Sequence, residues 1–128
     1  MFEGLRSLAG LAGVMKDLPR LQAAMEETRR EIAAIRRHGR AGGGAVTCEV
    51  SGSLELLDLR VSEPIAHALA DPAQRGMATL LVVEAINDGL RQARAAAAER
   101  AEASARAMGL PIPPGGILPS GGSVGLGG

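Results

Sequence analysis

Apolar or near-apolar positions between residues 14 and 35 recur at alternate spacings of four and three residues. They are Val14, Leu18, Leu21, Met25, Thr28, Ile32 and Ile35. This spacing places them on one face of a helix and is typical of a coiled-coil seam. Because proline suits only the first position of a helix, we expect regular helix from Pro19, with a separate short turn before it. Gly39 then suits the left-handed C-terminal cap, with Arg36 and Arg37 in the last turn.

The next pattern alternates with the period of a strand. Val46, Cys48 and Val50 alternate with polar residues, which predicts a half-buried strand. A second alternating run covers residues 54–61 after a turn, and its phase changes once; a bulge near Leu56 and Leu57, or two short strands, reconciles the two phases.

A second long helix is predicted after the strands. Asp71 followed by Pro72 is a helix-start signal, and no proline interrupts the chain from there to about Met108. Residues 62–76 before and around this start are expected to form a loop with one helical turn. The sequence therefore predicts an α+β fold. Its elements are a long helix, a short antiparallel hairpin or sheet of two or three strands, and a second long helix.

Three segments organise the chain. We expect a flexible lead-in at 1–13, one domain at 14–108, and a Gly/Pro-rich disordered tail at 109–128 that cannot offset its ordering entropy by burial. A lone hairpin is marginal in water, and the helix is apolar on most faces from Met77 to Ile86. We therefore expect a homodimer that buries this segment, with the second half of the long helix projecting.

Composition limits the compartment and the chemistry. Cys48 is the only cysteine, and we find neither a signal peptide nor an apolar run long enough for a bilayer, so a reducing cytoplasm without membrane association is expected. We expect Cys48 to be a small core residue rather than a nucleophile. His38 and His67 lie far apart, so the sequence predicts no metal site, cofactor, small-molecule substrate or enzymatic activity.

The triple glycine at 42–44 raises the question of phosphate binding. A phosphate-binding loop requires Lys and then Ser or Thr after its last glycine, followed by a helix, whereas Gly44 is followed by Ala45 and a strand. We therefore interpret the glycines as a joint between a helix and a strand. Asn87 and Asp88 are similarly expected to make a polar contact across the dimer or to neighbouring backbone, rather than to bind a ligand.

Charge is segregated although the net charge is zero. Residues 16–40 carry seven basic and four acidic side chains, residues 41–90 two and seven, and residues 91–108 four and two. Glu26 with Arg30, and Glu102 with Arg106, fit pairs four residues apart. A surplus of arginine on helical arms suits phosphate backbones. The expected DNA-binding residues are Lys16, Arg29, Arg30, Arg36, Arg37, Arg40, Arg91 and Arg94.

Two other interpretations of this surface are open. The basic residues also fit a plain solvated face, and the heptads fit a coiled-coil adaptor that binds a partner helix without nucleic acid. If nucleic acid is the partner, the absence of Tyr and Trp disfavours single strands, which bind by stacking, and leaves duplex DNA contacted through its backbone.

Several segments together resemble the YbaB/EbfC family of bacterial nucleoid-associated proteins. They are "MFEGL" at the start, the heptad helix, "GGGAVTCEVSG" leading into "LELLDLRV", "EAINDG" at 84–89 and "GLPIPPG" at 109–115. These matches cover most of residues 1–115 in the family's order.

The resemblance implies a tweezer-like, intertwined homodimer that binds duplex DNA through helical arms in the cytoplasmic nucleoid. It also implies a role in nucleoid organisation or gene regulation, and the family has no known catalytic activity. The chain departs from the family in the loop "SEPIAHALADPAQRG", in arginines that replace common lysines, and in a longer tail after Gly115. The departures leave the DNA sequence preference and the exact contact residues open.

Overall fold

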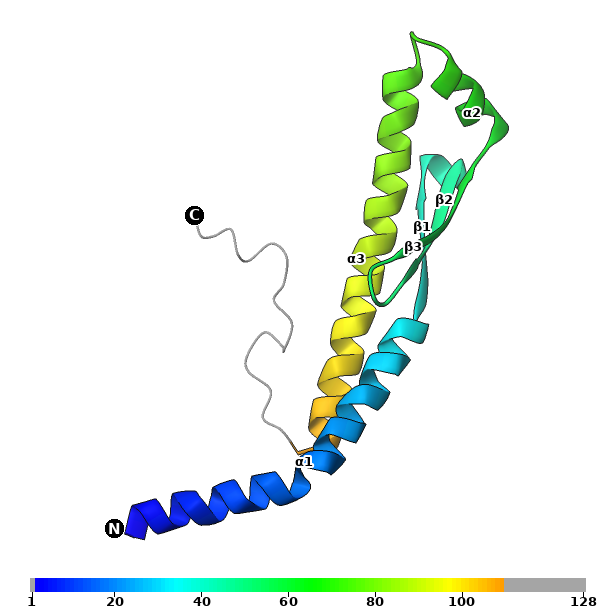
Figure 1. The fold of residues 1–128 in the computed structure, drawn as a ribbon. Helices are drawn as coiled ribbons and strands as arrows, with labels where there is room; N and C mark the ends of the chain where they lie inside the picture. The colour runs from blue at the N-terminus through cyan, green and yellow to red at the C-terminus, as the bar shows by residue number, and fades with distance from the viewer. Residues whose placement is uncertain (1, 110–128) are drawn as a thin grey trace.

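The computed structural model describes residues 2–109, with side chains from residue 16 onward. Its elements are α1 (Phe2–Ala34), β1 (Arg36–Ala41), a short 3₁₀ turn η1 (Gly42–Gly44), β2 (Val46–Ser51), β3 (Leu56–Val61), α2 (Glu63–Ala70) and α3 (Arg75–Ala107). Figure 1 shows the two long helices beside a small sheet, with α2 next to the N-terminal end of α3. The predicted α+β class is confirmed.

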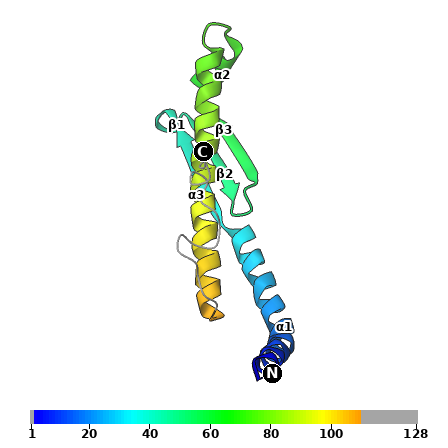
Figure 2. The ribbon, with the colours of Figure 1, turned by 90° about the vertical axis from the view of Figure 1, so that its left-hand side faces the viewer.

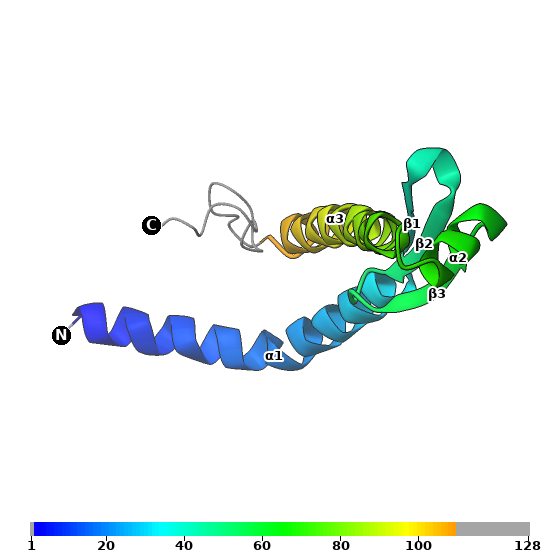
Figure 3. The same cartoon turned by 90° about the horizontal axis from the view of Figure 1, so that it is seen from above.

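Helix α1 begins earlier than predicted. It runs without interruption from Phe2 to Ala34 and contains Pro19, so the expected start at Pro19 is wrong. Proline lacks the amide that would bond to the preceding turn, which bends a helix without ending it. Figure 1 shows α1 bent in its middle, and Figure 3 shows its N-terminal part extending away from the sheet. The flexibility expected of residues 1–13 stays a prediction, and the tail expected to be disordered lies, beyond Gly109, outside the described residues.

Strand β1 occupies residues that the sequence assigned to the end of α1. The helix ends at Ala34, and Gly39 lies inside a strand rather than at a helix cap. Arg36 and Arg37 accordingly do not belong to the last helical turn. The triple glycine then connects β1 to β2, not a helix to a strand, and its three residues have positive φ angles that suit glycine.

The sheet is antiparallel throughout, in the order β1-β2-β3. Between β2 and β3, Glu49 pairs with Asp58 but Val50 pairs with Leu56, so Leu57 is an extra residue on β3. This bulge confirms the phase change predicted at Leu56 and Leu57.

Helix α3 begins at Arg75, so the predicted start at Asp71 is wrong. Asp71 instead closes the turn between α2 and α3, where its Oδ1 accepts a hydrogen bond from the amide of Ala73 at 2.9 Å. Residues 63–70, expected to hold one helical turn, form α2, whose first turn contains Pro64. The predicted end near Met108 is confirmed.

Small residues let α3 lie close against the sheet. Ala85, Gly89 and Ala93 are buried on the side of α3 that packs on β1 and β2, opposite Val46 and Val50. A Cβ atom on Gly89 would lie 2.8 Å from Val50 Cγ2 and 2.9 Å from Cys48 Sγ. The predicted core role of Cys48 is confirmed: the thiol is buried and donates a hydrogen bond to the carbonyl oxygen of Ala85 at 3.2 Å.

The same helix covers the β1 edge of the sheet. The Arg40 amide donates to Asp88 Oδ2 at 3.0 Å, and Gln92 Nε2 donates to the His38 carbonyl at 2.9 Å. Asp88 therefore makes the contact to neighbouring backbone that the sequence allowed. Figure 2 shows α3 across β1 and β2, with β3 to one side of it. Within residues 2–109, β3 is the uncovered edge strand.

Candidate nucleic-acid interface

Two of the predicted basic residues of α1, Arg29 and Arg30, form ion pairs within their own helix. Arg29 Nη1 lies 2.7 Å from Glu26 Oε1, and Arg30 Nη1 lies 3.1 Å from Glu27 Oε2. The predicted pairing of Glu26 with Arg30 is wrong, because two adjacent pairs at a spacing of three satisfy all four side chains at once. The partners are exposed, and exposed ion pairs contribute only about 0–1 kcal/mol, so both arginines can exchange a carboxylate for a phosphate at little cost.

Arg36 and Arg37 lie at the junction of α1 and β1. Arg36 Nη1 donates to the carbonyl oxygens of Ala33 at 2.8 Å and Ile35 at 2.9 Å, and its Nε lies 3.6 Å from Glu49 Oε2. These contacts satisfy carbonyls at the helix end. Arg37 Nη1 donates to the Arg36 carbonyl at 2.8 Å and is exposed. Arg36 therefore has a structural role that the sequence did not indicate.

The outer face of the sheet carries charge of both signs. Cross-strand register forms two rows across the sheet: Glu49 lies between His38 and Asp58, and Thr47 lies between Arg40 and Arg60. These side chains line a hollow of about 380 Å³. Arg60, which the predicted set omits, is held by Asp58, with 3.0 Å between its Nε and Oδ2. For the Arg40 guanidinium, the described residues provide no ion-pair partner within 4.0 Å.

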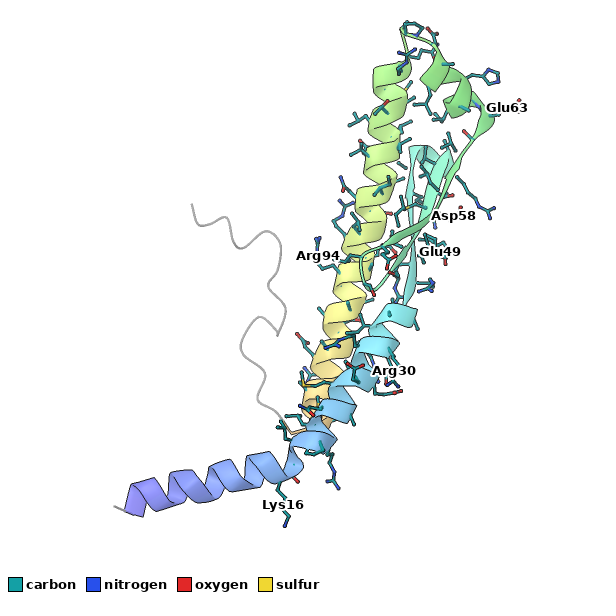
Figure 4. The ribbon with its side chains drawn as sticks, in the orientation of Figure 1. Lys16, Arg30, Glu49, Asp58, Glu63 and Arg94 are labelled. Atoms are coloured by element: carbon teal, nitrogen blue, oxygen red, sulfur yellow. The ribbon has the colours of Figure 1, made fainter. Side chains whose placement is uncertain are left out.

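Two predicted residues lie on α3, and Lys16 lies near the bend of α1. Arg91 Nη2 is 3.6 Å from Asp88 Oδ1. Arg94 and Lys16 are exposed, and neither has an ion-pair partner among the described side chains. In Figure 4, Arg94 projects from the side of α3 away from the sheet, whereas Arg30, Glu49 and Asp58 lie on the other side of the molecule. The predicted residues therefore do not gather on one face of a single chain.

Helices α1 and α3 are joined below the sheet into one arm. Thr28 Oγ1 donates to Ser104 Oγ at 2.7 Å, and Arg100 forms an ion pair with Glu31. The C-terminal half of α3 extends past the sheet as predicted, but it lies alongside α1 (Figures 1 and 2). Glu102 and Arg106 approach to 3.9 Å, which confirms that predicted pair.

The described part of the chain, residues 2–109, offers no metal-binding cluster and no membrane-spanning helix. There, no group of three or more His, Cys, Asp or Glu side chains is placed to hold a metal ion. No helix among these residues is long and apolar enough to cross a membrane. Asn87, which the sequence paired with Asp88, is exposed.

Comparisons with known proteins give a consistent picture. A nucleoid-associated protein from Polynucleobacter necessarius is 36% identical over 110 residues, covering 86% of this chain and 95% of that protein. The nucleoid-associated protein Atu0095 from Agrobacterium fabrum is 35% identical over 121 residues, covering 90% of this chain and 99% of that protein.

The fold also matches a solved structure. An uncharacterized protein, HP0035, from Helicobacter pylori superposes with a TM-score of 0.50 at 20% identity, covering 71% of this chain and 96% of that one. The model of the YbaB/EbfC DNA-binding family matches residues 8–108, which include every element of the fold except the first turns of α1. The chain belongs to the YbaB/EbfC DNA-binding family.

Proposed function

We propose that this protein binds duplex DNA in the nucleoid as a homodimer, through phosphate contacts from the basic side chains of its arms. Family membership supports DNA as the partner, and the basic surplus of residues 16–40 and 91–108 supports backbone contact. Such binding organises the nucleoid or regulates genes. The observation that carries the proposal is the set of exposed cations on the arms, whose only described ion pairs are weak surface pairs.

The homodimer is supported by apolar surface that one chain leaves open. Met77, Leu80 and Val83 on α3 are 54%, 56% and 46% exposed, although large apolar side chains gain about 1.5–3 kcal/mol each from full burial. On the uncovered edge strand, Leu56 and Leu57 are also exposed. Pairing of the β3 edges of two copies removes the open edge and covers its leucines, and contact between two α3 faces buries Met77, Leu80 and Val83.

A dimer also resolves the scattered positions of the cations. Arg94 projects on the opposite side of the chain from Arg30 (Figure 4), so one straight duplex does not reach both in a single copy. With a second copy, side chains on different faces of two chains can line the same gap. The proposal assigns phosphate contacts to Lys16, Arg29, Arg30, Arg91 and Arg94 on the helices, and to Arg36, Arg37 and Arg40 on the adjoining strand β1. Arg36 also supports the helix junction.

A double charge reversal, Lys16→Glu with Arg94→Glu, tests the proposal. Both side chains are exposed and lack described ion-pair partners, so the fold is expected to tolerate the changes. Because a dimer contains two copies of each residue, each substitution removes two phosphate contacts. Each lost contact reduces the magnitude of the negative slope of log K against log salt by about one. Fluorescence anisotropy on a mixed-sequence duplex is expected to show at least tenfold weaker binding and a shallower slope.

The matched control is Arg60→Glu, an exposed arginine of the sheet that is already paired with Asp58. It reverses one charge per chain where the double variant reverses two, lies outside the proposed contact residues, and is expected to bind within twofold of the parent. Equal weakening by the control and the double variant would refute the assignment to the arms. A coiled-coil adaptor, the alternative function, predicts no retention of DNA by the parent protein even at low salt.

A further inference from the structure

The arm carries an apolar groove that no described residue covers. It runs between α1 and the end of α3, has a volume of about 480 Å³, and is lined by Met25, Ile32, Ala101, Ala105 and Met108 among others. Met25 is 51% exposed there. We propose that the segment that follows α3, residues 110–114 with the sequence LPIPP, folds back into this groove of its own chain.

The geometry at the end of α3 supports a chain reversal. Gly109 has a φ of +74°, and its amide donates to the Arg106 carbonyl at 3.0 Å, which is the hydrogen bond of a Schellman cap. In this motif the next residue usually packs against the residue three positions before the helix cap. Here the next residue is Leu110, the cap is Met108, and the residue three positions before the cap is Ala105, which lines the groove. The first apolar residue of the segment is therefore directed to the groove.

The segment also fits the groove in length. Four steps of extended, polyproline-type chain from residue 110 to 114 span about 12 Å at 3.1 Å per residue. The groove wall on α3, from Ala101 to Met108, spans about 10 Å at 1.5 Å per residue. A chain reversed at Gly109 and running antiparallel to α3 therefore covers the groove from one end to the other.

Composition lowers the cost of docking. The segment contains Pro111, Pro113 and Pro114, whose fixed φ angles leave little conformational freedom to lose on binding. Leu110 and Ile112 supply the apolar side chains, and the segment carries no charge to desolvate. Docking covers Met25 and Ile32 and holds α1 against α3, independently of any contact with DNA.

Photo-crosslinking in the full-length chain tests this contact. A benzophenone amino acid replaces Ile112, the purified protein is irradiated, and the linked peptides are identified by mass spectrometry. Mixing light and heavy isotope-labelled copies separates links within one chain from links between chains. We expect links within one chain, concentrated on residues 25–32 and 101–108. Links mainly between chains would assign the groove to a second copy, and links outside the groove would exclude docking; either result overturns the proposal.

Two matched substitutions give the second readout. Met25→Glu places a charge in the groove and is expected to lower the crosslinking yield at least tenfold. Leu18→Glu changes an exposed apolar residue of the same helix, 38% exposed and outside the groove lining, and is expected to leave the yield within twofold. Because both side chains are exposed, neither change is expected to unfold the chain. A yield that does not respond to Met25→Glu would overturn the proposal.

Discussion

Replacing Gly39 by alanine tests the packing of α3 on β1. A Cβ atom at this position would lie less than 3 Å from the Ala85 carbonyl oxygen and from the amide nitrogen and Cα of Gly89. All three atoms belong to the α3 backbone, which cannot turn aside as a side chain can. Overpacking typically costs 1–3 kcal/mol, so we expect Gly39→Ala to lower the free energy of unfolding by at least about 3 kcal/mol. That is a large share of the roughly 5–15 kcal/mol of a typical domain.

Gly76→Ala is the matched control. A Cβ atom at Gly76, in the first turns of α3, has no neighbour within 4 Å. Alanine there is expected to raise stability by up to about 1 kcal/mol, because glycine loses more backbone entropy in a helix.

Urea denaturation followed by far-UV circular dichroism measures both variants, at one fixed protein concentration because dimerisation links stability to concentration. The absence of Trp and Tyr makes intrinsic fluorescence a poor probe. A Gly39→Ala variant within about 0.5 kcal/mol of the parent, the range of an ordinary surface change, would refute this packing of α3 on β1.

Three further predictions concern the β1 edge, the dimer and the helix junction. Asp88→Ala removes the acceptor of the Arg40 amide and is expected to lower the free energy of unfolding by about 1.5 kcal/mol in urea denaturation. The control, Asn87→Ala at the exposed neighbour, is expected to lower it by less than about 0.5 kcal/mol. Equal effects would contradict the edge contact. Leu80→Glu is expected to convert the dimer to a monomer in light scattering while helicity is retained, and an intact dimer would remove this face from the interface. Arg36→Gln is expected to lower stability by about 1 kcal/mol through lost carbonyl contacts, and an unchanged urea midpoint would refute its role at the junction.

The sequence predicted the elements with strong periodicity. The four-and-three spacing in α1, the alternation in β2 and the bulge at Leu57 are local signals, and each appears in the structure. Strand β1 was missed because it carries no apolar alternation: its inward positions are Gly39 and Ala41, kept small by the approach of α3. Only the tertiary contact explains why this segment is extended. Helix α2 did have a signal, Pro64 in its first turn, but the helix is short.

The candidate site was less predictable than the fold. Sequence spacing alone does not decide between Glu26 and Glu27 as partners of neighbouring arginines, because both spacings of three and four bring charges together on a helix. The role of Arg36 depends on where α1 ends, and the sequence placed that end too late. Arg60 was left out of the predicted set because it belongs to the acidic part of the sequence, and the structure pairs it with Asp58 on β3, one strand away from Arg40 across Thr47.

The salt dependence of DNA affinity tests the proposed function most directly. The full-length protein is titrated onto a mixed-sequence duplex between about 50 and 200 mM salt, and binding is followed by fluorescence anisotropy. If the arms bind phosphates, affinity falls by about 10³–10⁵ over this range for six to ten contacts, and duplexes of different sequence give similar slopes. Absence of binding at the lowest salt, or an affinity that does not change with salt, would contradict the account.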